Sequence, residues 1–129
     1  MGRGLVTLKI RADFLRVADA RRKAVTPGLI LQAAPRPDAS GCSAIVRVGF
    51  TASRKVGNAV VRNRAKRRLR EAAAVILPRE GRPDIDYVLI ARGSTVDRPY
   101  AALITDLEAA LRRINRGTRH ERQDAAEEK

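Results

Sequence analysis

The feature that most constrains this chain is residues 54–70, a segment with eight basic residues and no acidic one. The later part of this segment continues into residues 71–76. If this stretch forms a helix with 100° per residue, its apolar side chains lie on one narrow stripe. The stripe consists of Val61, Ala65, Leu69, Ala72 and Ile76. One side can therefore pack on a sheet while the rest presents guanidinium groups. We predict a helix from about Asn58 to Leu77, capped by Asn58 and ended by Pro78.

The charge pattern of this helix favours a polyanionic partner. Like charges lie one turn apart, where each pair costs about a few tenths of a kcal/mol. The pairs are Arg62–Lys66, Lys66–Arg70 and Arg64–Arg68. The whole chain carries 27 Lys and Arg against 14 acidic residues, a net charge of +13. Most of the cations are arginines, whose planar fork suits phosphate, so we expect nucleic acid rather than a membrane surface.

The residue inventory argues against protein-based catalysis. Cys42 is the only cysteine and His120 the only histidine. A thiolate zinc cluster, an internal disulfide and a histidine-based nucleophile system are therefore excluded, and no compact carboxylate group suggests a two-metal site. We expect no catalytic residue and no metal bound by the protein. No apolar run approaches the length of a membrane span and no signal-peptide pattern opens the chain, so a cytoplasmic protein is expected.

The remaining pattern predicts an α+β fold. The expected elements are a helix over 11–24, strands over 29–34 and 43–52, a strand over 85–92 and a helix over 98–114, with a loop over 35–41. In the second strand Val46, Val48 and Phe50 share a face, and in the third Tyr87, Leu89 and Ala91 do.

The order α-β-β-α-β-α indicates an α/β sandwich, one small mixed sheet with helices packed on it. The short loop between the first two strands predicts that they pair antiparallel. We expect one domain over 1–116 and a solvated, disordered tail over 117–129.

Residues 50–71 resemble the signature of the bacterial ribonuclease P protein subunit. The core of the match is Lys55-Val56-Gly57-Asn58-Ala59-Val60, followed by Arg62-Asn63-Arg64. Weaker similarity extends over roughly residues 5–115. The resemblance implies a fold like ribosomal S5 domain 2, with a left-handed βαβ crossover. It also implies a catalytic RNA as partner, precursor tRNA as substrate, and removal of the 5′ leader by that RNA and its Mg²⁺ while the protein assists. No obligate protein partner is expected.

The resemblance assigns roles to two groups of residues. Phosphate contacts are expected from Arg62, Arg64, Lys66, Arg67, Arg68 and Arg70, while Asn63 fixes local geometry or contacts a base edge. A cleft between the first helix and the sheet is expected to hold the single-stranded leader, with Phe14, Arg54 and Lys55 at matching positions. A base stacked on an aromatic ring gains about 1–3 kcal/mol. Family members often carry further aromatics where this chain has Ala18 and Gln32.

Several alternatives stay open from the residues alone. Phe14 could equally be a core residue, and Asn63 an ordinary helix-surface residue. A structural RNA-binding protein of the ribosomal type fits the composition and fold as well as an RNA-enzyme subunit does, and only residues 50–71 separate the two. A DNA-binding regulator is disfavoured because no helix-turn-helix spacing precedes the basic helix.

Overall fold

The computed structural model describes residues 4–37 and 45–127, with side chains in the second range as far as residue 116. The elements in chain order are β1 (Gly4–Thr7), α1 (Arg11–Asp19), β2 (Arg22–Val25), β3 (Leu29–Pro35), β4 (Ile45–Thr51), α2 (Ala59–Glu80), β5 (Ile85–Ala91) and α3 (Tyr100–Glu127). The predicted loop over 35–41 and the predicted start of a strand at residue 43 fall largely outside the described residues.

One mixed sheet holds the fold together, in the strand order β1-β4-β5-β3-β2. The β1–β4 and β4–β5 pairs are parallel, whereas β3–β5 and β2–β3 are antiparallel. Since β4 and β5 are parallel neighbours, the chain between them crosses over the sheet through α2, which forms the βαβ unit. The prediction of a small mixed sheet covered by helices is confirmed.

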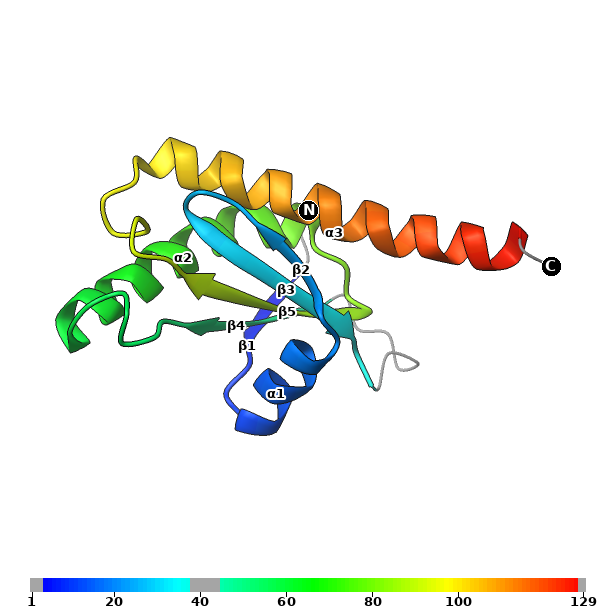
Figure 1. Ribbon diagram of the computed structural model, residues 1–129, viewed down its shortest axis with the longest axis horizontal. Helices are drawn as coiled ribbons and strands as arrows, with labels where there is room; N and C mark the ends of the chain where they lie inside the picture. The colour runs from blue at the N-terminus through cyan, green and yellow to red at the C-terminus, as the bar shows by residue number, and fades with distance from the viewer. Residues whose placement is uncertain (1–3, 38–44, 128–129) are drawn as a thin grey trace.

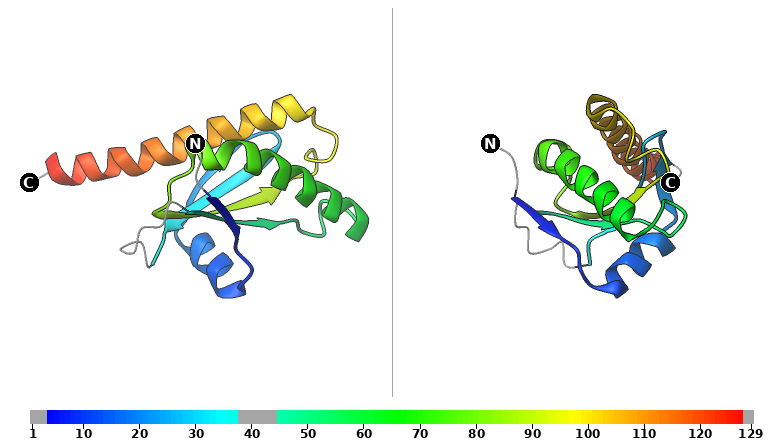
Figure 2. Two further views of the ribbon diagram at one scale, coloured as in Figure 1. Left: turned by 180° about the vertical axis from the view of Figure 1, so that it is seen from behind. Right: turned by 90° about the vertical axis from the view of Figure 1, so that its left-hand side faces the viewer.

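The helices cover the two faces of the sheet unequally. Figure 2 shows α2 and α3 side by side on one face and the short α1 alone on the other. The main core lies under α2 and α3 and takes in the residues of β4 and β5 that were predicted to share a face. A smaller core, built around Leu8, Val17, Ala34 and Val88, lies under α1. Because α1 is short, part of that second face stays open.

The prediction of a first helix over 11–24 is wrong at its C-terminal end. α1 stops at Asp19, and Arg21 has φ of 56°, a left-handed conformation that cannot continue a helix. Residues 22–25 form β2, which pairs with β3 from Arg22 opposite Ala33 to Val25 opposite Ile30. Their composition suits a helix, but the hydrogen bonds and the burial of Ala24 on the sheet decide against it. β1 was also not predicted.

The predicted pairing of the strands over 29–34 and 43–52 is wrong. β5 lies between β3 and β4 and pairs with both. Six of its seven residues are buried, as expected of a central strand covered on both faces. This continuous burial places β5 at the centre, although β3 and β4 are nearer to each other in the sequence.

The C-terminal ends of the two later helices were predicted too early. Pro78 lies inside α2, which continues to Glu80. In the last helical turn, proline removes only its own N–H, and the Gly81 N–H still donates to the Leu77 carbonyl at 2.8 Å. α3 runs to Glu127 rather than ending near residue 114 (Figure 1).

Candidate nucleic-acid interface

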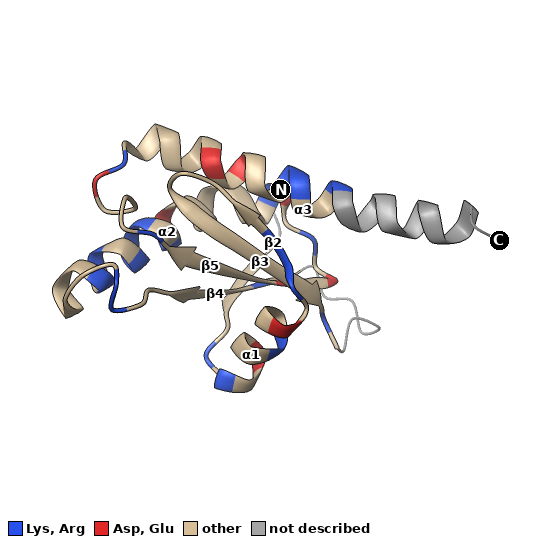
Figure 3. Ribbon diagram, viewed as in Figure 1, with Lys and Arg blue, Asp and Glu red and all other residues tan. Residues whose placement is uncertain are grey.

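The first component of the site is the N-terminal half of α2. The Asn58 side chain accepts a hydrogen bond from the Val61 N–H at 3.0 Å, so the predicted N-cap is confirmed. Ala65, Leu69 and Ala72 are fully buried against the sheet and α3. With this stripe turned inward, the basic side chains of the same turns are left exposed or half-buried. Figure 3 shows how closely the basic positions follow one another along this half of α2.

The predicted phosphate-binding residues differ in how they are held. Asn63, Arg64, Arg67 and Arg70 are exposed, whereas Arg62, Lys66 and Arg68 are half-buried. Within the described part of the chain, no hydrogen bond or ion pair engages the side chains of Arg62, Arg64, Lys66 or Arg67. These four cations have no internal counterion there, so a polyanion can neutralise them without breaking a contact.

Two of the predicted residues have internal partners. The Arg68 Nη1 donates to the backbone oxygens of Thr95 at 2.8 Å and Val96 at 2.5 Å. The Arg70 guanidinium lies over the Phe50 ring, 5.7 Å from its centroid, within the range of a cation–π contact. The seven residues on the helix are therefore not equivalent.

The second component is a groove of about 510 Å³ between α1 and the open part of the sheet. Phe14 lines it, as the cleft prediction requires, and so do Ala18 and Gln32. Phe14 rests directly above Gly49 of β4: a Cβ on Gly49 would come within 2.6 Å of two ring carbons. The missing side chain at Gly49 therefore lets the ring lie close to the sheet.

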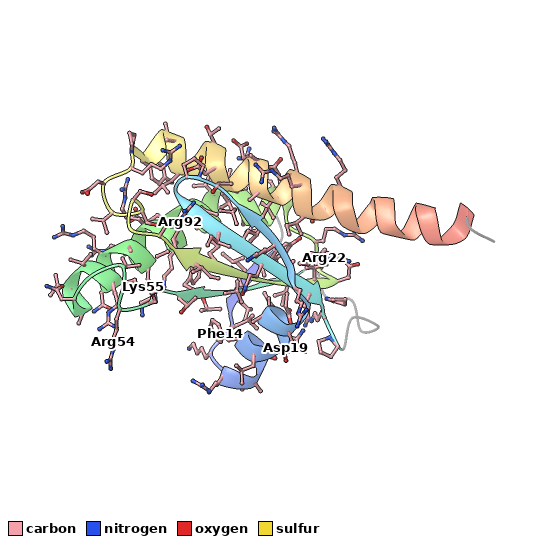
Figure 4. The ribbon with its side chains drawn as sticks, in the orientation of Figure 1. Phe14, Asp19, Arg22, Arg54, Lys55 and Arg92 are labelled. Carbon is pink, nitrogen blue, oxygen red and sulfur yellow. The ribbon has the colours of Figure 1, made fainter. Side chains whose placement is uncertain are left out.

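Arg54 and Lys55 do not line this groove. They lie on the loop after β4, where both are exposed and Figure 4 shows them apart from Phe14. The loop follows Phe50 and Thr51, which do line the groove, so the two cations extend its end towards α2. The structure thus brings Phe14 into the cleft and places Arg54 and Lys55 beyond one end of it.

Sequence reasoning missed two basic residues of the groove, Lys9 and Arg11. Arg11 opens α1 three residues before Phe14 and seven before Ala18, a spacing that puts all three on one helix face. That spacing was a usable signal for Arg11. Lys9 precedes the helix, and only the path from β1 into α1 brings it to the groove.

In residues 4–37 and 45–116, no group of three or more His, Cys, Asp or Glu side chains could hold a metal ion. The same part of the chain offers no helix long and apolar enough to cross a membrane. What the site presents is a set of cations and an open groove floored by apolar and amide side chains.

The fold and this surface define a class, a small α+β protein that offers an exposed basic helix and a neighbouring groove to a polyanion. Comparison with known proteins makes the class specific: the Ribonuclease P family model matches residues 4–115. The ribonuclease P protein component of Paramagnetospirillum magneticum is 55% identical over 114 residues, 88% of this chain and 86% of that one. That of Ruegeria pomeroyi is 53% identical over 113 residues, 87% and 88% of the two chains.

A solved structure agrees with the sequence relatives. The Staphylococcus aureus RNase P protein superposes with a TM-score of 0.66 at 26% identity, covering 82% of this chain and 92% of that one. The chain belongs to the ribonuclease P protein component family. Composition and fold left two classes of protein open, an RNA-enzyme subunit and a structural protein of the ribosomal type. Membership of this family decides for the RNA-enzyme subunit.

Proposed function

We propose that this chain binds the catalytic RNA of ribonuclease P through the exposed face of α2. The observation that carries the proposal is a set of cations on that face that have no partner among the described residues, beside a family match that includes the whole helix. These cations are Arg62, Arg64, Lys66 and Arg67. Arg70 and Asn63 extend the same surface. Phosphate contacts would position the protein on the RNA without any sequence readout.

We propose further that the groove under α1 holds the single-stranded 5′ leader of precursor tRNA. Phe14 offers a ring for stacking, Gln32 an amide for a base edge, and Lys9 and Arg11 charges for the backbone. Arg54 and Lys55 would receive the strand as it leaves the groove towards α2. In this scheme the RNA and its Mg²⁺ hydrolyse the phosphodiester bond, and the protein increases affinity for the substrate.

The direct test is reconstitution of the full chain with a bacterial ribonuclease P RNA at low Mg²⁺, scoring cleavage of the 5′ leader. The protein should restore cleavage that the RNA alone performs poorly under these conditions. Its binding to the RNA should fall steeply with salt, with a log–log slope of several units if about six phosphates are contacted. A protein that neither binds the RNA nor improves cleavage would refute the proposed function.

The groove can be tested by two substitutions that act on the same ring. Phe14→Ala removes the ring, and Gly49→Ala should displace it, because the new Cβ would lie 2.6 Å from two of its carbons. Both should weaken binding of precursor tRNA to the holoenzyme by about 1–3 kcal/mol, the contribution of one stacked base. Binding of mature tRNA, which lacks the leader, should be unaffected.

Val75→Ala is a suitable control for this pair, since Val75 is an exposed apolar residue of α2 away from the groove. It should leave both affinities unchanged. If Phe14→Ala weakened precursor and mature tRNA equally, the ring would be a packing residue and the leader assignment would fail.

A further inference from the structure

We infer that Arg68 is a positioning residue, which anchors α2 so that its neighbours meet the RNA, and that it is not itself one of the phosphate contacts. This inference rests on the proposed RNA-binding function of α2. It separates one arginine of the basic helix from the others by its contacts, which the charge pattern alone does not do.

The first argument is the way α2 is held at its N-terminal end. Residues 59–64 are exposed or half-buried, and Ala65 is the first fully buried residue of the helix. Figures 1 and 2 show this end of α2 extending past the ends of β4 and β5. The orientation of the turn that carries Arg62 and Arg64 therefore depends on the next turns of α2, which are the first that pack against the rest of the protein. Arg68 lies in those turns, between Ala65 and Leu69.

The second argument is the geometry of the Arg68 hydrogen bonds. One nitrogen, Nη1, donates to two consecutive backbone carbonyls, those of Thr95 and Val96. Hydrogen bonds from a charged donor contribute more to stability than an exposed ion pair does. A pair of acceptors on one loop also adds a directional constraint on the helix to the packing of its apolar stripe.

The third argument is that the loop receiving Arg68 is itself fixed. The Thr95 side chain is fully buried, its hydroxyl donates to the Gly28 carbonyl at 2.7 Å, and it accepts from the Arg92 N–H at 2.7 Å. The Arg92 guanidinium, labelled in Figure 4, donates to the Thr26 carbonyl at 2.7 Å. The loop after β5 is thereby tied to the turn between β2 and β3, and Arg68 connects α2 to this rigid part of the sheet.

Arg67 provides a matched comparison because it precedes Arg68 and carries the same charge. Its side chain is exposed and has no hydrogen bond or ion pair within the described residues. Thr95→Val supplies a second comparison, since it disturbs the loop that receives Arg68 without removing a positive charge. The set Arg68→Ala, Arg67→Ala and Thr95→Val therefore separates loss of charge from loss of position.

The experiment measures binding of each full-length variant to ribonuclease P RNA across a salt series, at a temperature well below all the melting transitions. Arg68→Ala and Thr95→Val should each lower affinity about tenfold, as expected for one charge-assisted hydrogen bond, and should leave the log–log salt slope unchanged. Arg67→Ala should reduce the slope by about one unit. The double variant Arg68→Ala/Thr95→Val should bind the RNA with the same affinity as the single variant that binds less tightly. Both substitutions disrupt the same attachment of α2 to the loop after β5, so their effects should not add.

Two results would overturn the inference. A slope reduced by Arg68→Ala as much as by Arg67→Ala would make Arg68 a phosphate contact. A lowered melting temperature with unchanged affinity in the folded protein would make it a purely stabilising residue. In either case the wild-type protein and Arg67→Ala would still report on RNA binding, so the proposed function would be judged separately.

Discussion

Replacing Asp86 with alanine should lower the free energy of unfolding by about 1.5–3 kcal/mol, because it removes the fully buried one of the two carboxylates that pair with Arg16 and Arg47 and leaves both arginines only with Asp13. Asp86 is fully buried on the central strand β5. The Arg47 Nη2 donates to its Oδ2 at 2.9 Å, and the Arg16 Nη2 donates to the same oxygen. Denaturant unfolding monitored by circular dichroism at neutral pH would measure the loss.

The Asp86 cluster also supports the groove. Arg16 belongs to α1 and further donates to the Pro35 carbonyl at 3.0 Å, so its guanidinium fastens this helix to the sheet. Partial burial by itself would lower the pKa of Arg16, but hydrogen bonds with Asp86 and Asp13 raise the pKa above its ordinary value. Arg16 therefore stays charged at any pH used for binding. We expect Asp86→Ala to loosen α1 and weaken discrimination of precursor from mature tRNA.

Asp84→Ala is the control for Asp86→Ala. Asp84 also pairs with an arginine, Arg82, at 2.9 Å, but both side chains are about one-third exposed. A pair in that environment contributes no more than about 1 kcal/mol. Equal losses for the two variants would contradict the view that burial makes Asp86 the critical carboxylate.

Removing three of the unpaired cations of α2 together should have the largest effect on RNA binding. In the variant Arg62→Ala/Arg64→Ala/Arg67→Ala, three phosphate contacts are lost at about 1 kcal/mol each, so affinity should fall about a hundredfold. The log–log salt slope should decrease by two to three units, about 0.9 for each contact. Filter binding of ribonuclease P RNA across a salt series measures both quantities.

The fold should be insensitive to the same triple change. The three residues lie outside the core, and removing them relieves repulsion along the helix, so the melting temperature should stay the same or rise slightly. Lysine at all three positions keeps the charge and should preserve the salt slope. A large slope decrease in the lysine variant, or unfolding of the alanine variant, would show that these arginines do not act as exposed phosphate contacts.

The helix and the cleft differed in how far they could be predicted. The basic helix was predictable because its apolar stripe, its cap and its cations all lie within one short segment. The cleft joins residues from α1, β3, β4, β5 and the segment before α1, so Phe14 was placed in it only through a family resemblance. Arg11 could have been found from its helical spacing with Phe14, whereas Lys9 entered the site only through the path of the chain from β1 into α1.

The amino-acid sequence by itself determined the local properties of this protein: a basic amphipathic helix, alternating strand faces and a surface suited to a polyanion. These follow from periodicity and charge within a few neighbouring residues. Only the tertiary structure decided that β5 lies between β3 and β4, that residues 22–25 form a strand, and that Arg68 is bound to the Thr95 loop while Arg67 is exposed. Each of these depends on hydrogen bonds and burial between separate elements, which the pattern within a single element does not encode.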